Sequence, residues 1–254
     1  MRLHAVEAGT GPPLVLLHGL FGSARNFGTV QRRLAERWRV LALDLRNHGA
    51  SPHAPGMDYA TQATDVRETL AALGALPAAV VGHSMGGKVA MRLALDGPGS
   101  VSRLVVADIA PVTYPPHFRS YAQAMGALSL SPRLTRAAAD EALAEAVSDP
   151  TVRGFLLQNL SFGTHPGWRI GLAEIAAGLP AIEGFEAPAR ARYAGPALFL
   201  AGERSDYVRP EHRLAIRALF PAARFVTLKN AGHWLHADQP AAFVAAVAAF
   251  LGAP

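Results

Sequence analysis

The sequence contains no cysteine among its 254 residues. This absence excludes disulfide bonds, zinc–thiolate sites, iron–sulfur clusters and a cysteine nucleophile. Long apolar runs are also missing, because the most apolar stretch, 241–253, is shorter than the roughly 18–20 residues that a membrane span needs. Residues 1–7 lack the apolar region of a secretion signal. We therefore expect a protein without a membrane span, located in the cytoplasm, a compartment with which a cysteine-free chain is compatible.

Charged residues are also scarce. Only 17% of the residues are charged whereas 50% are hydrophobic, and a disordered chain shows the reverse balance. The formal net charge is +5, and Lys88 and Lys229 are the only lysines among the basic residues. Nucleic-acid-binding proteins cluster their positive charge. Here the arginines are scattered, and the densest group, at 32–39, includes Glu36. No nucleic-acid partner is expected.

Apolar runs alternate with amphipathic stretches at both ends of the chain. We predict buried strands at 14–17, 40–43, 78–81, 104–106, 197–200 and 224–228, and helices at 26–38, 61–73, 85–95, 210–220 and 241–253. This alternation indicates an α/β fold with a parallel sheet covered on both faces. The segment 112–191 has helical patterns and many prolines but no buried strand. We therefore expect a core formed by 1–111 and 192–254, with 112–191 as a helical cap.

The strongest local motif is Gly82–Gly87, which reads GHSMGG and matches G-x-S-x-G. It follows a predicted strand and precedes a predicted helix. A serine in that context lies on a sharp, strained turn, which exposes its hydroxyl and directs the next backbone N–H toward the reacting oxygen. The flanking glycines allow the turn to close. We therefore predict that Ser84 is a catalytic nucleophile.

A serine hydroxyl needs a general base, and the base needs an acid that orients it. His233 follows the last predicted strand and is the predicted base, whereas His236 is expected to pack or to lie on the surface. The acid should lie between Ser84 and His233 in the sequence, and both Asp108 and Asp206 do. An aspartate that ends an apolar strand, as Asp108 does, is costly to bury without a partner, and an imidazole N–H would be one.

Acyl transfer also needs hydrogen-bond donors for the developing oxyanion. The candidates are the backbone N–H of Met85 and that of Leu20, which lies in the loop after the first long predicted strand. His18 is expected to brace this loop. The turn that contains Arg46, Asn47 and His48 is expected to pack against the same loop, unless Arg46 or His48 faces the pocket. Lys88, one turn into the helix after the serine, is expected at the helix surface, unless it attracts an anionic substrate. No metal ion or organic cofactor is expected.

Four motifs, in order, resemble those of the α/β-hydrolase superfamily: LLHGLFGS, DLRNHGASPH, GHSMGGK and NAGHWLHADQP. The resemblance covers essentially the whole chain. It implies an α/β-hydrolase fold with a mostly parallel eight-stranded sheet, helices on both faces and a helical cap inserted after strand 6. Three segments, DLRNHGASPH, GHSMGGK and ADIAPVTY, more narrowly resemble a subgroup of small bacterial carboxylesterases and acyl-CoA thioesterases that has mitochondrial relatives.

This resemblance bears on the choice of acid. Many members of the superfamily carry the acid after strand 7, at the position that Ser205 occupies here, and Asp206 is one residue late. The narrower subgroup takes its acid from the end of strand 6, which implies Asp108. Ser205 would then hydrogen bond Asp108 or cap the following helix. Asp206 remains the alternative acid.

We therefore expect a serine carboxylesterase that hydrolyses acyl esters, or acyl-CoA thioesters, through an acyl-enzyme on Ser84. Apolar residues of the cap are expected to form an acyl pocket or to pack against the core: Phe118, Phe155, Leu156, Leu157, Leu160 and Phe162. One alternative is a lyase or C–C bond hydrolase of the same fold, of the menaquinone-pathway type, which would use the three residues as a base. Another is a non-catalytic binding module. The sequence makes no prediction of the oligomeric state.

Overall fold

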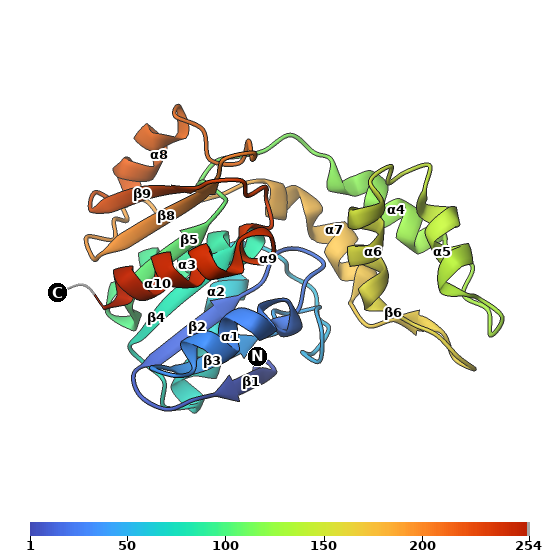
Figure 1. The fold of residues 1–254 in the computed structure, drawn as a ribbon, viewed down its shortest axis with the longest axis horizontal. Coiled ribbons are helices and arrows are strands. Elements are labelled where there is room, and N and C mark those ends of the chain that lie inside the picture. The colour runs from blue at the N-terminus through green and yellow to red at the C-terminus, as the bar shows by residue number, and fades with distance from the viewer. Residues whose placement is uncertain (253–254) are drawn as a thin grey trace.

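A seven-stranded sheet lies at the centre of the protein in the computed structural model, which describes residues 1–252 (Figure 1). Its strands, in spatial order, are β1 (Ala5–Ala8), β3 (Arg39–Leu43), β2 (Pro13–Leu17), β4 (Ala78–His83), β5 (Val101–Ala107), β8 (Ala197–Gly202) and β9 (Ala223–Leu228). The β1 strand runs antiparallel to β3, and the other neighbouring pairs are parallel. The loops after β4, β5, β8 and β9 therefore leave the sheet at the same end.

Helices cover both faces of this sheet. They are α1 (Gly28–Leu34), α2 (Tyr59–Ala72), α3 (Met85–Asp96), α8 (His212–Leu219), α9 (Leu235–Asp238) and α10 (Pro240–Leu251). The helix predicted over 26–38 is shorter in the structure, because a 3₁₀ turn, η1 (Ala24–Phe27), precedes α1 and the chain leaves the helix after Leu34. Trp38 lies in the loop before β3 and not on a helix, and its side chain is buried.

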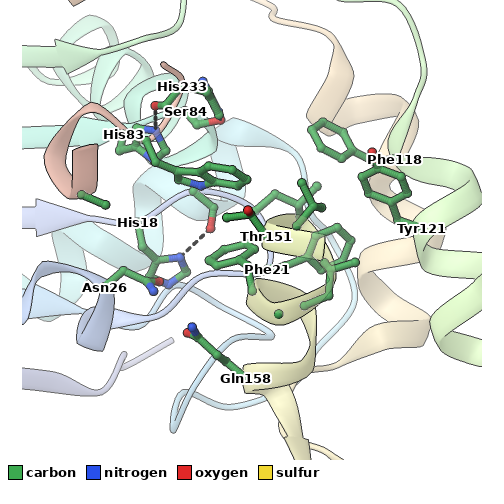
Figure 2. A pocket seen from close by; sticks show the side chains of 18 of the residues that line it. His18, Phe21, Asn26, His83, Ser84, Phe118, Tyr121, Thr151, Gln158 and His233 are labelled. Carbon is green, nitrogen blue, oxygen red and sulfur yellow. Dashed lines mark hydrogen bonds between the residues drawn. The ribbon is translucent and has the colours of Figure 1, made fainter. Parts of the chain in front are cut away.

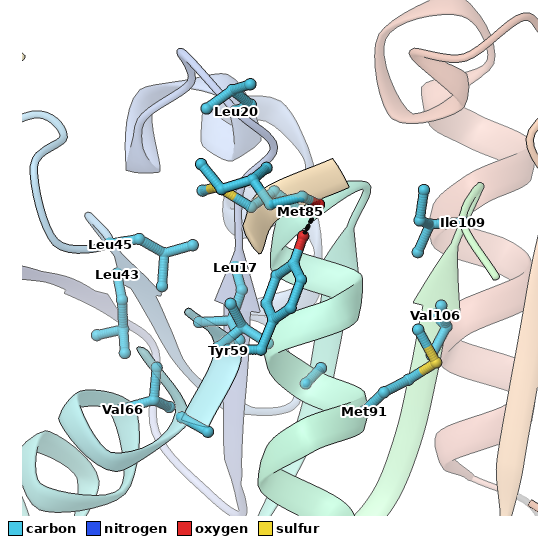
Figure 3. Close-up of a cluster of buried hydrophobic side chains, with 14 of the residues drawn as sticks. Leu17, Leu20, Leu43, Leu45, Tyr59, Val66, Met85, Met91, Val106 and Ile109 are labelled. Atoms are coloured by element: carbon cyan, nitrogen blue, oxygen red, sulfur yellow. Dashed lines mark hydrogen bonds between the residues drawn. The ribbon is translucent and has the colours of Figure 1, made fainter. Parts of the chain in front are cut away.

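Alternate residues of the central strands belong to opposite layers of the core. In β2, Val15 and Leu17 join the cluster that includes residues of α2 and α3, part of which Figure 3 shows. Leu14 and Leu16 join the cluster that includes residues of α1 and α10. All four side chains are fully buried. The prediction of a mostly parallel sheet with helices on both faces is therefore confirmed.

Local rules explain where several helices begin. Asp58 precedes α2, and its carboxylate accepts a hydrogen bond from the backbone N–H of Thr61 at 2.8 Å. Such a cap satisfies one of the N–H groups that the first turn leaves without a partner. Pro240 is the first residue of α10, where its missing N–H is tolerated and its fixed φ suits the helix.

The chain leaves the sheet between β5 and β8. This segment forms α4 (Phe118–Ala127), α5 (Arg136–Leu143), α6 (Pro150–Leu156), a short hairpin of β6 (Leu160–Ser161) and β7 (Gly167–Trp168), and α7 (Leu172–Glu183). Figure 1 shows α4, α5, α6 and the hairpin grouped to one side of the sheet, with α7 reaching back toward it. The segment is thus held close to the loops that follow the parallel strands.

The expected strand count was wrong. The resemblance implied eight strands, with the cap after the sixth, whereas the sheet has seven strands among the described residues and the insertion follows the fifth, β5. The difference lies at the antiparallel edge, which β1 forms. Residues before β1 bond to α2 instead of to a neighbouring strand: the N-terminal ammonium contacts Asp65 at 2.7 Å, and the Leu3 N–H donates to Thr69 Oγ1 at 2.9 Å.

Candidate active site

Ser84 lies on a strained turn between β4 and α3. Its backbone has φ 53° and ψ −120°, a conformation that side chains rarely adopt. The turn requires its glycines, because a Cβ added at Gly82 would lie 2.2 Å from the carbonyl oxygen of Gly86, and one added at Gly86 would lie 2.3 Å from that of Leu17. Strain of this kind is retained where surrounding structure enforces it, often at functional sites.

Three side chains from three different loops form a continuous hydrogen-bonded chain. Ser84 Oγ lies 3.1 Å from His233 Nε2, and His233 Nδ1 lies 2.8 Å from Asp108 Oδ2. Since a carboxylate only accepts hydrogen bonds, Nδ1 carries the proton and Nε2 accepts from the serine hydroxyl. The imidazole is thereby held in the tautomer that a general base for Ser84 requires.

Asp108 is the acidic residue that the structure brings to His233. It follows β5 and is fully buried, and its other oxygen, Oδ1, accepts a hydrogen bond from the Gly202 N–H at 2.9 Å. The Ser205 hydroxyl donates to Oδ2, which is the first of the two contacts that the sequence left open for Ser205. These donors compensate for burying a carboxylate. Asp206, by contrast, has a side chain that is 90% exposed and lies 3.8 Å from Arg209.

Aromatic rings hold His233 in place. The ring of Tyr207 stacks on it with centroids 4.1 Å apart and an interplanar angle of 25°. His83, the residue before the serine, donates from Nε2 to the backbone carbonyl of His233 at 2.8 Å. Burial lowers the pKa of His83 well below its ordinary value, and the neighbouring His236 adds to that effect, so His83 stays neutral. No local pattern in the sequence points to this role of Tyr207.

His236 packs in the interior, which is the first of the two positions expected for it, packed or on the surface. Its ring lies 4.6 Å from that of His83 and 4.9 Å from that of Phe27. Burial lowers its pKa to about 4. A neutral, buried ring without a contact to the serine is a packing residue rather than a base.

The loop after β2 lies against the serine. A Cβ added at Gly19 would be 3.2 Å from Ser84 Cβ, so the backbone approaches closely here. His18 braces the loop as expected, since its Nε2 accepts from the Leu45 N–H at 2.9 Å and its Nδ1 donates to the Gly19 carbonyl at 2.8 Å. Among residues 1–252, the backbone N–H groups of Leu20 and Met85 have no hydrogen-bond partner. These are the two candidate oxyanion donors.

His48 supports the same loop from behind. Its Nε2 accepts a hydrogen bond from the Phe21 N–H at 3.1 Å, and its Nδ1 donates to the Arg46 carbonyl at 2.8 Å. Burial lowers the pKa of His48 to about 3, so the ring keeps the neutral state that these two bonds need. The expectation that His48 packs against the loop matches this geometry.

A cavity of about 670 Å³ opens in front of Ser84 (Figure 2). Ser84 and His233 lie at its inner end, and Phe118 and Tyr121 of α4 lie across from them. Of the apolar residues expected in an acyl pocket, Phe118, Phe155 and Leu156 line the cavity. The others differ: Leu157 and Leu160 are buried outside its lining, and Phe162 is exposed.

Lys88 lies in the interior, so the expectation of a helix-surface charge was wrong. It is 1% exposed, and its Nζ donates to the carbonyls of Glu183 and Gly184 at 3.1 and 2.6 Å, at the end of α7. A helix C-terminus carries partial negative charge and orphan carbonyls, which a cation satisfies. Burial lowers the pKa of Lys88 to about 7, and the charge of Glu183 partly offsets this. Only the tertiary contact of α7 reveals this role.

Within the described part of the chain, no group of three or more histidine, aspartate or glutamate side chains is arranged to hold a metal ion. Over the same residues, no helix is long and apolar enough to cross a membrane.

The family model described as the α/β hydrolase fold matches residues 12–240. A mouse protein named as the sn-1-specific diacylglycerol lipase ABHD11 is 44% identical over 95% of this chain and 81% of its own length. Esterase YbfF of Escherichia coli is 38% identical over 94% of this chain and 92% of its own length.

Solved structures show the same likeness. One described as a marine microorganism esterase superposes with a TM-score of 0.94 at 34% identity, covering 98% of this chain and 99% of the other. The similarity therefore includes both the sheet and the segment between β5 and β8.

Proposed function

This chain belongs to the α/β-hydrolase family and is a hydrolase of the esterase and lipase type, and we propose that it hydrolyses esters through an acyl-enzyme on Ser84. The single observation that carries this proposal is the hydrogen-bonded chain from Ser84 through His233 to Asp108. The expectation of an esterase of this fold is confirmed; the roles of the individual residues are our proposal.

In the first step Ser84 Oγ attacks the acyl carbonyl. His233 Nε2, 3.1 Å from that oxygen, accepts the proton as the bond forms. Asp108 stays ionised, fixes the tautomer and stabilises the imidazolium. The stacked ring of Tyr207 adds a favourable interaction with the cation that forms on His233.

The carbonyl oxygen becomes negatively charged as the tetrahedral intermediate forms. The N–H groups of Leu20 and Met85 are free to bind it, and removing one such donor typically costs about 3–4 kcal/mol in the transition state. His233 then gives its proton to the leaving alcohol. Water attacks the acyl-enzyme with His233 again as base, which returns the free acid and Ser84.

The proposed substrates are acyl esters. The mouse relative is named as a diacylglycerol lipase, so glycerol esters are a class to test, and acyl-CoA thioesters are another. We propose that the core is formed by 1–111 and 192–254, and that 112–191 act as the cap, since Phe118, Phe155 and Leu156 of this segment line the cavity. We also propose the cytoplasm as the location, to be checked by cell fractionation.

The test is hydrolysis of p-nitrophenyl esters from acetate to palmitate by the wild type, Ser84→Ala and Ser102→Ala. Ser102 is an exposed serine on β5 and serves as the matched control. We expect wild type and Ser102→Ala to be equally active and Ser84→Ala to fall to background. Activity in Ser84→Ala equal to the wild type would refute the proposal.

A second measurement separates ester hydrolysis from the lyase alternative. An esterase forms an acyl-enzyme on Ser84 during ester turnover, and mass spectrometry of the digested protein would detect the acylated Ser84 peptide. A lyase that uses the triad only as a base would be inert toward the ester series and would form no acyl-enzyme. Covalent addition of an active-site phosphonate to Ser84 would show in addition that the Ser84 hydroxyl is nucleophilic.

A further inference from the structure

Two cavities of very different size meet at Ser84. The larger, of about 670 Å³, is lined by both Ser84 and His233. The smaller, of about 20 Å³, is lined by Ser84 and Met85 but not by His233. Leu20, which carries one proposed oxyanion donor, borders both. We call the smaller one the inner compartment; its lining is Leu20, Tyr59, Ser84, Met85, Lys88, Ile109, Tyr114, Phe118, Ile182, Glu183 and Tyr207.

The chemistry of the intermediate decides which substituent faces which cavity. The tetrahedral carbon carries Ser84 Oγ, the oxyanion, the leaving oxygen and the acyl chain. The leaving oxygen must face His233, because it receives its proton from Nε2. The larger cavity is the one that His233 lines, so the alcohol lies there. The acyl chain points away from His233, toward the inner compartment.

We propose that this enzyme is selective for esters of short acyl groups, acetyl to propionyl, with large apolar alcohols. A cavity volume of about 10–15 Å³ is enough to hold one group of the size of a water molecule or a methyl group. The inner compartment, at about 20 Å³, therefore has room for one or two such groups beyond the carbonyl carbon. The proposal rests on the esterase function above and specifies its substrate class.

The walls of the inner compartment are held by hydrogen bonds, which argues against their moving aside for a longer chain. The Tyr59 hydroxyl donates to the Ile182 carbonyl at 2.5 Å, and Figure 3 shows this bond beside Met85. The Tyr114 hydroxyl accepts from the Ala110 N–H at 2.9 Å and donates to the Tyr207 carbonyl at 2.6 Å.

The compartment also selects against charged acyl groups. Lys88 is the cation on its wall, but its Nζ is directed to three backbone carbonyls, those of Ile182, Glu183 and Gly184. The ring of Tyr114 covers it at 4.9 Å. A carboxylate at the end of the acyl chain would find no free donor on Lys88, so the acyl group is uncharged.

The sharpest test compares two isomeric esters, hexyl acetate and ethyl hexanoate. They have the same composition and leaving alcohols of similar acidity, but the long chain lies on the alcohol in one ester and on the acyl group in the other. Each kcat/KM is divided by the alkaline hydrolysis rate of the same ester, which removes intrinsic reactivity. We expect hexyl acetate to be preferred by about 10- to 100-fold, since even one misplaced methylene group costs roughly 10-fold or more. Equal rates, or a preference for ethyl hexanoate, would overturn the proposal.

Variants locate the selectivity. Ile182→Ala should enlarge the inner compartment and raise the kcat/KM of ethyl hexanoate relative to hexyl acetate by about 10-fold. Val152→Ala, which changes only the wall of the larger cavity, should not raise the kcat/KM of ethyl hexanoate, because the hexanoyl chain of this ester lies outside that cavity. Should Ile182→Ala fail to fold, Ile109→Val makes a milder change in the same compartment. An equal rise in the kcat/KM of ethyl hexanoate with Val152→Ala would contradict the assignment of the two cavities.

Different results would refute the esterase function and the acyl selectivity. Failure of the proposed function would appear as no hydrolysis of either ester, or as hydrolysis that survives Ser84→Ala. The selectivity for short acyl groups would be refuted by Ser84-dependent hydrolysis that prefers ethyl hexanoate to hexyl acetate. That result would assign the acyl chain to the larger cavity.

Discussion

Replacing Asp108 by asparagine should remove catalysis while leaving the site's shape intact. In the wild type, Asp108 accepts three hydrogen bonds, from the Gly202 N–H, the Ser205 hydroxyl and His233 Nδ1. An amide can keep its oxygen toward Gly202 and then turns its NH₂ toward His233. His233 must then present a lone pair at Nδ1, which moves its proton to Nε2 and leaves no base facing Ser84.

The size of the effect follows from this change of tautomer. The same substitution in other serine hydrolases lowers kcat by about 10⁴-fold, which corresponds to about 5.4 kcal/mol in the transition state. The assay is kcat on p-nitrophenyl acetate for Asp108→Asn. KM should change little, because Asp108 is fully buried and lies outside the lining of both cavities at Ser84.

Asp206→Asn is the matched control. Its side chain is 90% exposed and makes only a 3.8 Å contact with Arg209. Exposed ion pairs contribute little, so we expect kcat within about two-fold of the wild type. A near-normal rate for Asp108→Asn, or a large loss for Asp206→Asn, would show that Asp108 is not the acid that orients His233.

Three further predictions concern the supports of the site. Gly86→Ala should destabilise the fold by about 3 kcal/mol, because its Cβ would lie 2.3 Å from a backbone oxygen of β2, whereas Gly126→Ala meets nothing within 4 Å; urea unfolding measures both, and equal stabilities would contradict the prediction. Ser205→Ala should lower kcat about 10-fold by removing one donor to Asp108, with KM unchanged; a raised KM at normal kcat would point to substrate binding instead. Burial lowers the pKa of His236 to about 4, below its ordinary 6.5, so the unfolded chain binds a proton there that the folded protein does not. This contribution to the free energy of unfolding is complete above pH 6.5, and about 3 kcal/mol of it is lost as the pH falls to 4. Unfolding free energies from urea titrations that stay constant between pH 6.5 and pH 4 would contradict this prediction.

The local features of this protein follow from its sequence alone. Apolar runs such as 78–81 predict buried strands because a chain buried on both faces needs continuous apolar residues. The glycines around Ser84 predict a tight turn, since any Cβ there would collide with neighbouring backbone. His233 can be proposed as the general base because it closely follows the last predicted strand. These are consequences of residues close together along the chain.

Tertiary structure alone decided what depends on distant residues meeting. The sequence order allowed both Asp108 and Asp206, and only the three-dimensional arrangement brings Asp108 Oδ2 to 2.8 Å from His233 while exposing Asp206. Lys88 has the sequence context of a surface lysine and is buried because the end of α7, about a hundred residues away, supplies carbonyls to it. The inner compartment likewise exists only where α3, α7 and the loop after β5 meet. Cavity volume and hydrogen-bond partners depend on packing between elements, and no local pattern in the chain encodes them.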